Sequence, residues 1–141
     1  MADTAPSLRL TYEGAQKALA AGMRRAAETG VPQCIAVVDA GGHLIAFARM
    51  DGAYASAIET ALRKAQTAAA YGRETGFIPD GLDLRLALAT DGRRVNLLGG
   101  VPVVIDGLVA GAVGVGSGTG EQDRAVARAA VAAIDGATRF G

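Results

Sequence analysis

The fold of this chain is decided by the stretch Val37-Val38-Asp39-Ala40-Gly41-Gly42-His43-Leu44-Ile45. Two apolar runs flank a pair of glycines, and glycine adopts the positive φ of a tight hairpin turn without steric strain. The pattern predicts an antiparallel hairpin with strands over residues 33–40 and 43–49. Strands joined by a hairpin are not the parallel neighbours of a crossover unit, so a Rossmann fold is disfavoured.

More strands are predicted in the second half of the chain. Asp106-Gly107 is a two-residue hairpin signal between candidate strands over residues 101–105 and 108–115. Residues 94–98 form a further strand candidate, separated from the next one by Gly99-Gly100. Together with the first hairpin, these segments predict a largely antiparallel, five-stranded sheet.

The first and last helices carry clear end signals. Thr11 is a suitable N-cap for a helix that ends near Glu28. A last helix is predicted over residues 121–135, behind a capping box formed by Thr119 and Gln122. In such a box the two side chains satisfy backbone groups that the first helical turn leaves without partners.

Two helices are expected between the hairpins. Ser56 and Glu59 form a capping-box pattern that opens a helix ending near Tyr71. On a 3.6-residue wheel, the core face of this helix consists of Ile58, Ala61, Leu62, Ala65 and Ala69. A shorter helix is expected to start near Pro79, with three residues turned inward: Leu82, Leu86 and Ala89. The expected fold class is therefore α/β, of the α+β kind, with a largely antiparallel five-stranded sheet flanked by helices.

Composition and charge exclude several function classes. The 141 residues suit a single domain spanning residues 1–141. Lys plus Arg and Asp plus Glu are balanced at 14 each, so the chain offers no net field that attracts nucleic acid or an anionic membrane. No apolar stretch approaches the roughly 20 residues of a membrane span, and the first seven residues lack the pattern of a secretory signal. The expected location is the cytoplasm, which suits a chain with one cysteine, Cys34.

The first hairpin carries candidate catalytic groups. His43 is the only histidine, so an imidazole base or metal ligand has to be His43, although a polar residue beside a turn is also commonly just solvated. Asp39 ends the first strand, where it is either a proton-transfer group or a turn former. Antiparallel pairing is expected to bring Asp39 and Asp51 near the same sheet end. With a single histidine and no cysteine or histidine partner nearby, a protein-held zinc ion is not expected.

Two cations are candidates for substrate chemistry. Lys64 lies at the shoulder of the alanine-rich helix face, whereas Arg63 points away from it. Partial desolvation lowers the pKa of a lysine and suits a base, a Schiff-base nucleophile or an anion clamp, while the competing interpretation is a snorkelling side chain. Arg49 closes the second strand, where its guanidinium group either grips a carboxylate or forms a surface ion pair.

A glycine-rich loop, Gly116-Ser117-Gly118-Thr119-Gly120, precedes the last helix. Small residues let backbone N–H groups converge on an anion at a helix N-terminus, so the loop is either an anion cradle or a tight turn. It matches neither the dinucleotide-binding pattern nor the P-loop pattern. No nucleotide cofactor is therefore expected.

Four motifs together resemble the GlcG/HbpS family. They are A-V-V-D-A-G-G-H-L-I-A-F-A-R-M-D-G-A at residues 36–53, R-K-A-x-T-A at 63–68, G-G-V-P-V at 99–103 and G-A-V-G-V at 111–115, followed by the glycine-rich loop. The same domain is similar to the C-terminal part of the PduO cobalamin adenosyltransferase. The resemblance implies a profilin-like fold, self-association into homo-oligomers and, for some members, binding of haem or another tetrapyrrole. It also makes Met50, Gly99 and Gly100, which lie in these motifs, candidate ligand-binding residues.

The first functional hypothesis is a small-ligand-binding protein with haem as the candidate cofactor. His43 is then the only iron ligand available, because the first helix contains no histidine of the kind that ligates haem in the PduO-like domain. The alternative is a cofactor-independent isomerase or lyase acting on a small organic acid or carbonyl compound. In that enzyme Lys64 is the base or electrophile, Asp39 or His43 moves the proton, and Arg49 with the glycine-rich loop holds the carboxylate. A stabilising partner of another enzyme, without chemistry of its own, is a third alternative.

Overall fold

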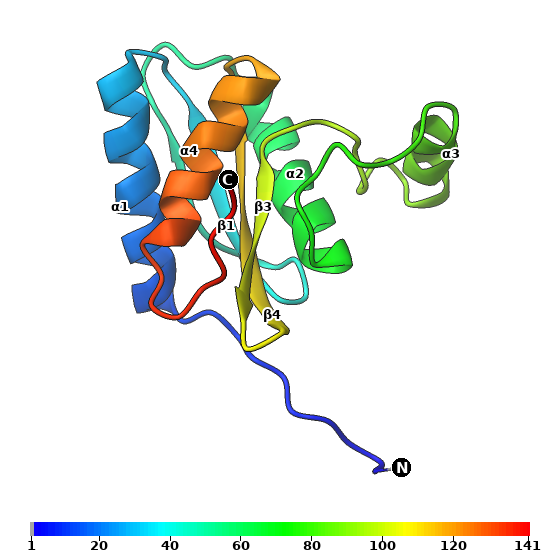
Figure 1. Cartoon of the computed structure of the whole chain (residues 1–141). Coiled ribbons are helices and arrows are strands. Elements are labelled where there is room, and N and C mark those ends of the chain that lie inside the picture. Colours follow the sequence, from blue (N-terminus) through cyan, green and yellow to red (C-terminus); the bar gives the residue numbers. More distant parts are fainter. Residues whose placement is uncertain (1) are drawn as a thin grey trace.

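A four-stranded antiparallel sheet forms the centre of the fold (Figure 1). The structure is a computed structural model that describes residues 2–141, so Met1, the first residue of the expected domain, lies outside it. The sheet order is β2-β1-β4-β3, and every neighbouring pair is antiparallel. The strands are β1 (Cys34–Asp39), β2 (Leu44–Arg49), β3 (Gly100–Ile105) and β4 (Leu108–Gly116).

Helices cover both faces of the sheet. α1 and α4 pack on one face and α2 packs on the other, whereas α3 projects away from the body (Figure 1). The helices are α1 (Tyr12–Thr29), α2 (Ala57–Tyr71), α3 (Leu82–Ala89) and α4 (Gly120–Ala132). No helix within residues 2–141 has both the length and the apolar character needed to cross a membrane.

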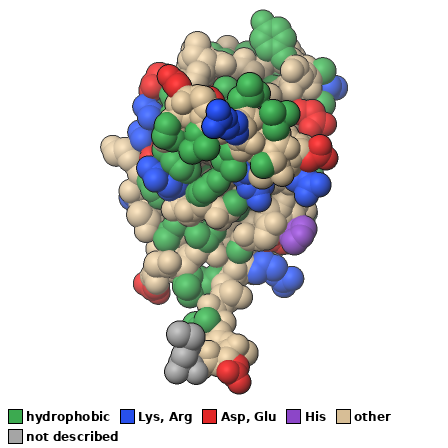
Figure 2. Space-filling view, turned by 90° about the vertical axis from the view of Figure 1, so that its right-hand side faces the viewer, with side chains coloured by type: hydrophobic (Ala, Val, Ile, Leu, Met, Phe, Trp, Pro, Cys, Tyr) green, Lys and Arg blue, Asp and Glu red, His purple; other side chains and the backbone are tan. Residues whose placement is uncertain are grey.

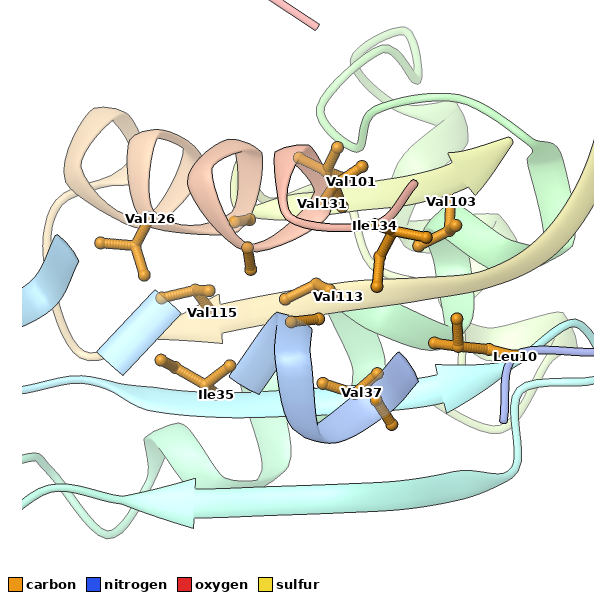
Figure 3. Close-up of a cluster of buried hydrophobic side chains, with 14 of the residues drawn as sticks. Leu10, Ile35, Val37, Val101, Val103, Val113, Val115, Val126, Val131 and Ile134 are labelled. Carbon is orange, nitrogen blue, oxygen red and sulfur yellow. The ribbon is translucent and has the colours of Figure 1, made fainter. Parts of the chain in front are cut away.

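The two faces of β1 contribute to two separate cores. Ile35 and Val37 face α1 and α4, where they meet valines of β3, β4 and α4 (Figure 3). Cys34, Ala36 and Val38 face α2, whose alanines complete a second cluster. Because both faces of the strand are buried, its sequence is a continuous apolar run rather than an alternating one.

α2 lies close to the sheet because both surfaces are built from very small side chains. A Cβ atom at Gly114 would collide with the Ala61 carbonyl oxygen, and one at Gly100 would collide with the Lys64 carbonyl oxygen. The alanine-rich face of α2 therefore rests on glycines of β3 and β4. Packing at this density leaves no space for an added methyl group.

Three predicted chain features are confirmed in detail. Thr11 caps α1 by accepting a hydrogen bond from the Gly14 N–H (3.0 Å). The capping box of α4 is present, with both reciprocal hydrogen bonds between Thr119 and Gln122 in place. The hairpin between β3 and β4 turns at Asp106-Gly107, where both residues have positive φ.

The sheet has four strands rather than the expected five, because residues 94–98 do not pair with a neighbouring strand. Their backbone groups bond to side chains instead. The Val95 N–H donates to Thr67 Oγ1 (3.0 Å). The Leu97 carbonyl oxygen accepts a hydrogen bond from Thr75 Oγ1. The strand prediction was wrong because two threonines distant in sequence form the backbone hydrogen bonds that a neighbouring strand would have formed.

The first hairpin is antiparallel as predicted, but its turn is longer than two residues. Four residues, Ala40 to His43, link β1 and β2, and among them only Gly42 has positive φ. The Asp39 N–H donates to the His43 carbonyl oxygen (2.9 Å), which closes the loop. This longer loop places the Asp39 side chain against the turn.

Two expectations for α2 were wrong. Ser56 itself has helical φ and ψ and its side chain makes no cap hydrogen bond, so the capping box with Glu59 does not form. The buried face is also rotated relative to the expected one, since Ile58 is 38% exposed whereas Lys64 is buried. The glycines of the sheet explain the rotation, because only the smallest side chains of the helix fit against them.

α3 is present where a short helix was expected, but it does not join the core. None of its residues, all within the described part of the chain, is buried. The helix lies away from the sheet, against residues 95–97 (Figure 1). The inward orientation expected for Leu82, Leu86 and Ala89 is therefore wrong.

Candidate functional site

The Asp39 carboxylate organises the turn of the first hairpin. Its Oδ1 atom accepts hydrogen bonds from the N–H groups of Gly41 (2.9 Å) and His43 (3.0 Å), and it lies 3.1 Å from His43 Nδ1. Burial acts to raise the pKa of Asp39, but these N–H groups and the imidazole outweigh it, so the pKa lies below its ordinary value. Asp39 is thus a turn former, and it also orients the His43 ring.

A cavity of about 490 Å³, called the basic cavity below, lies beside this turn. His43 lines it from the hairpin, Arg63 from α2, and Arg93 and Arg94 from the segment that precedes β3. Figure 2 shows the single histidine, in purple, at the surface with basic side chains nearby. Across the described residues 2–141, no carboxylate lines the cavity, so its charge is positive.

Neutral side chains hold the walls of the basic cavity together. Gln66 Nε2 donates to the Gly42 carbonyl oxygen (3.1 Å), and Gln66 Oε1 accepts from Arg63 Nη1 (2.9 Å). Thr67, which is fully buried, accepts from the Val95 N–H (3.0 Å). The hairpin turn, α2 and the segment that precedes β3 are therefore fixed to one another.

At the other end of the sheet, Lys64 belongs to a buried hydrogen-bond network. Its Nζ atom donates to Asp123 Oδ2 (2.8 Å) and to the Val115 carbonyl oxygen (2.9 Å). Asp123 Oδ1 accepts from the Gly118 N–H (2.9 Å) and, with the amide nitrogen turned toward it, from Gln33 (2.8 Å). Burial raises the pKa of Asp123, while the hydrogen bond from Lys64 acts in the opposite direction. The Lys64 ammonium group is thus bonded within the protein and is not directed at a ligand.

The glycine-rich loop uses its N–H groups to bind side chains of the following helix. The Gly118 N–H donates to Asp123 Oδ1 (2.9 Å), and the Thr119 N–H donates to Gln122 Oε1 (2.9 Å). Both acceptors lie in the first turn of α4. These contacts are those of a tight turn before a capped helix, and the two N–H groups are not open to an anion.

The other small residues near this loop have structural roles. The Ser117 Oγ atom accepts from the Tyr54 N–H (2.9 Å), and Ser117 has a φ of 90°. Gly99, Gly100 and Gly116 have no space for a side chain, because a Cβ atom at each would contact α2, α4 or β4 too closely. Packing alone therefore accounts for glycine at these three positions.

Arg49 is the last residue of the outer strand β2, and Met50 follows it. Both lie at the end of the sheet that carries the glycine-rich loop. The Met50 Sδ atom accepts from the Gln33 N–H (3.4 Å), which ties it to the start of β1. Arg49 pairs in register with Cys34, and its side chain is exposed. Burial raises the pKa of the Cys34 thiol, and the nearby charge of Arg49 offsets part of that rise. Arg49 keeps its guanidinium group open to solvent.

The predicted site residues lie at two opposite ends of the sheet. β1 begins beside Arg49 and the glycine-rich loop and ends at Asp39. At about 3.3 Å per residue, the length of β1 separates the two ends by roughly 17 Å. Within one chain, Lys64 and Arg49 therefore do not meet the proton-transfer candidates that the enzyme hypothesis pairs with them. The expectation that Asp39 and Asp51 share a sheet end was wrong, because Asp51 follows the far end of β2.

Sequence reasoning missed the residues that make the cavity basic. Arg93 and Arg94 open the segment that was expected to be a strand, and Arg63 was expected only to point away from the core. Two adjacent arginines directly after a turn were an available signal, since a buried strand rarely begins with two charges. Asp123 was also missed as the partner of Lys64, because an acidic residue in a first helical turn is expected from the helix dipole alone.

The chain matches known proteins over most of its length. The family model described as haem degrading protein HbpS-like matches residues 10–132. Protein GlcG of Escherichia coli K12 is 43% identical over 107 residues, which cover 75% of this chain and 80% of that protein. The crystal structure of the Klebsiella pneumoniae protein ORFY has a TM-score of 0.89 at 31% identity and covers 98% of this chain and 99% of its own. The crystal structure of a PduOC–haem complex has a TM-score of 0.85 at 30% identity, with coverage of 94% and 100%. This chain therefore belongs to the HbpS-like family.

Proposed function

We propose that this protein binds a small ligand that is haem or a related tetrapyrrole, with His43 as the iron ligand. The observation that carries the proposal is the placement of His43, whose side chain is 82% exposed at the edge of the basic cavity. Its Nδ1 atom faces Asp39, which leaves Nε2 as the coordinating atom. The description of the family as haem-degrading and the haem complex of the similar PduOC protein support the choice of ligand.

The residues around the cavity fit the polar groups of haem. Imidazole is a common axial ligand of haem iron, and guanidinium groups bind carboxylates such as the two propionates. Apolar cover for the flat ring is small, since the cavity wall offers Ala40 and Ala70. We therefore expect the affinity to be modest. When bound, haem supplies a redox-active iron, and the residues of this chain hold and orient it.

Asp39 is expected to act as a positioning residue for the iron ligand. A carboxylate beside Nδ1 favours the tautomer that carries its proton there, so Nε2 is the nitrogen whose lone pair is free to bind iron. The same carboxylate fixes the turn through the Gly41 N–H, so one group holds both the ring and the backbone. Removal of the Asp39 carboxylate should weaken iron ligation although the imidazole remains.

Titration of the purified protein with hemin tests the proposal. We expect a saturable, shifted Soret band in the native protein and loss of the shift in His43→Ala. Added imidazole should restore the shift in that variant, because free imidazole would replace the deleted side chain as the iron ligand. Arg24→Ala, a change on the exposed side of α1, is the control and should leave the titration unchanged. A featureless titration of the native protein would exclude haem, and an unchanged spectrum in His43→Ala would exclude His43.

We also propose that the chain self-associates, as the family resemblance implies. The projecting helix α3 and the segment beside it expose four large apolar side chains: Leu82, Leu84, Leu88 and Leu97. Figure 2 shows hydrophobic side chains gathered on this side of the molecule. Large apolar side chains exposed on one side of a molecule are typical of protein interfaces. A second copy of the chain would cover the surface that α3 leaves without a partner.

A further inference from the structure

We propose that the basic cavity binds a compact oxyanion with two or more negatively charged oxygen atoms, of the phosphate or dicarboxylate class, through Arg63, Arg93 and Arg94. The three guanidinium groups come from two separate segments and line the same cavity. The proposal concerns the cavity of the haem proposal, but it does not depend on His43 as an iron ligand.

The charge of the cavity calls for an anion. The chain as a whole has a formal net charge of zero, yet three arginines gather here. Like charges held close together repel each other unless a counter-charge lies between them. Neighbouring carboxylates offset the charge of the three arginines only in part. Asp39 is bonded to its own turn, and Glu59 lies 3.7 Å from Arg63 Nη2 with 73% of its side chain exposed.

An exposed ion pair at such a distance contributes little free energy, so Arg63 remains largely available to a ligand. Arg93 and Arg94 take part in no ion pair anywhere in the described part of the chain. The Arg94 guanidinium group donates to the Arg93 carbonyl oxygen (3.2 Å), which leaves most of its five donors free.

The Arg63 side chain and the backbone that carries the other two arginines are positioned before any ligand arrives. Arg63 is oriented by its hydrogen bond to Gln66, which is fixed to the hairpin turn. The segment that carries Arg93 and Arg94 is tied to α2 through Thr67. Side chains and loops that are ordered in advance lose less entropy on binding, so a small ligand with few contacts is held more tightly.

The size and lining of the cavity select the class of ligand. A volume of about 490 Å³ lies within the range of small-molecule sites. The walls present guanidinium, imidazole and amide groups and few apolar side chains, which favours a ligand rich in oxygen atoms. The planar fork of arginine matches the geometry of carboxylate and phosphate groups. A compact oxyanion satisfies these conditions better than a neutral molecule.

Isothermal titration calorimetry at constant ionic strength tests the proposal, with inorganic phosphate in one arm and succinate in the other. We expect saturable binding of one probe, and the probe that binds identifies the class. The double variant Arg93→Gln/Arg94→Gln should bind at least about tenfold more weakly, because it removes two charged hydrogen-bond donors from the oxyanion. Absence of saturable binding in both arms would overturn the proposal.

The matched control is Arg24→Gln/Arg25→Gln, which removes the same charge from another adjacent arginine pair, exposed on α1. It should leave binding unchanged, and equal weakening in both double variants would overturn the proposal in favour of unspecific attraction. His43→Ala separates the two proposals for the cavity. It should lose the hemin shift, whereas oxyanion binding, which depends mainly on the three arginines, should remain saturable. Each proposal is therefore tested by its own measurement.

Discussion

Lys64 Nζ lies 2.8 Å from the Asp123 carboxylate, and the two side chains are only 6% and 3% exposed. The contact joins α2 to the first turn of α4, and the second hydrogen bond of the ammonium group, to Val115, adds the end of β4. One ion pair therefore connects three elements beneath the glycine-rich loop. A buried charge that loses its partner is strongly destabilising, because water no longer solvates it.

Lys64→Met should lower the free energy of unfolding by about 3–5 kcal/mol, because it leaves the Asp123 carboxylate buried without a counter-charge. Methionine retains much of the apolar stem of lysine, so the loss reports the charge more than a cavity. Urea unfolding followed by circular dichroism measures the difference.

The double variant Lys64→Met/Asp123→Asn is the control for this pair. It removes both charges, while the asparagine oxygen still accepts from the Gly118 N–H. The double variant should regain a substantial part of the free energy of unfolding that Lys64→Met loses. A double-mutant cycle measures this coupling directly. Strictly additive losses would mean that the two side chains do not act as a pair.

Gly114→Ala should lower the free energy of unfolding by about 3 kcal/mol or more, because its methyl group collides with the backbone of α2 at Ala61. Gly81→Ala is the comparison, since a Cβ atom there meets nothing within 4 Å and only the positive φ of 86° is unfavourable. That strain amounts to about 1–2 kcal/mol. Denaturant unfolding measures the free energy of unfolding of both variants and so tests the close approach of α2 to β4. Equal losses in the two variants would contradict that close approach.

Acid should weaken the first hairpin through Asp39, whose pKa in the folded protein lies below its ordinary value of 3.8. A lowered pKa means that the carboxylate stabilises the fold above that ordinary value, and that this contribution is lost as the pH falls through the folded pKa. Asp39→Asn keeps an acceptor for the turn but does not titrate. Its unfolding free energy should fall less than that of the native protein between about pH 5 and pH 2. If the free energy of unfolding in urea depended on pH in the same way in the native protein and in Asp39→Asn, Asp39 would not be the group responsible.

Leu84→Glu/Leu88→Glu should lower the molar mass measured by light scattering, because charges on the exposed face of α3 oppose its burial against a second copy. Leu44→Glu places one such charge on an exposed leucine of β2 and should leave the mass unchanged. A native protein that scatters as a monomer at all concentrations would contradict self-association.

Local signals predicted most of the fold. The caps at Thr11 and Thr119 and the turn at Asp106-Gly107 involve neighbouring residues only, so backbone sterics and nearby side chains decide their outcome. Residues 94–98 have the composition of a strand, but a strand also needs a pairing partner. Thr67, which lies well upstream in the chain, accepts a backbone hydrogen bond from this segment instead. No local sequence pattern predicts that contact.

The helices, the two antiparallel hairpins and the family could be read from the amino-acid sequence, because periodicity, turn residues and short motifs are properties of residues close together in the chain. The surroundings of the functional side chains, in contrast, depend on contacts between distant segments of the folded chain. Arg63 and Lys64 are adjacent, but a helix turns about 100° per residue, so Arg63 enters the basic cavity and Lys64 the buried pair with Asp123. Whether a charge finds a buried partner or stays open to a ligand depends on elements that meet only when the chain folds.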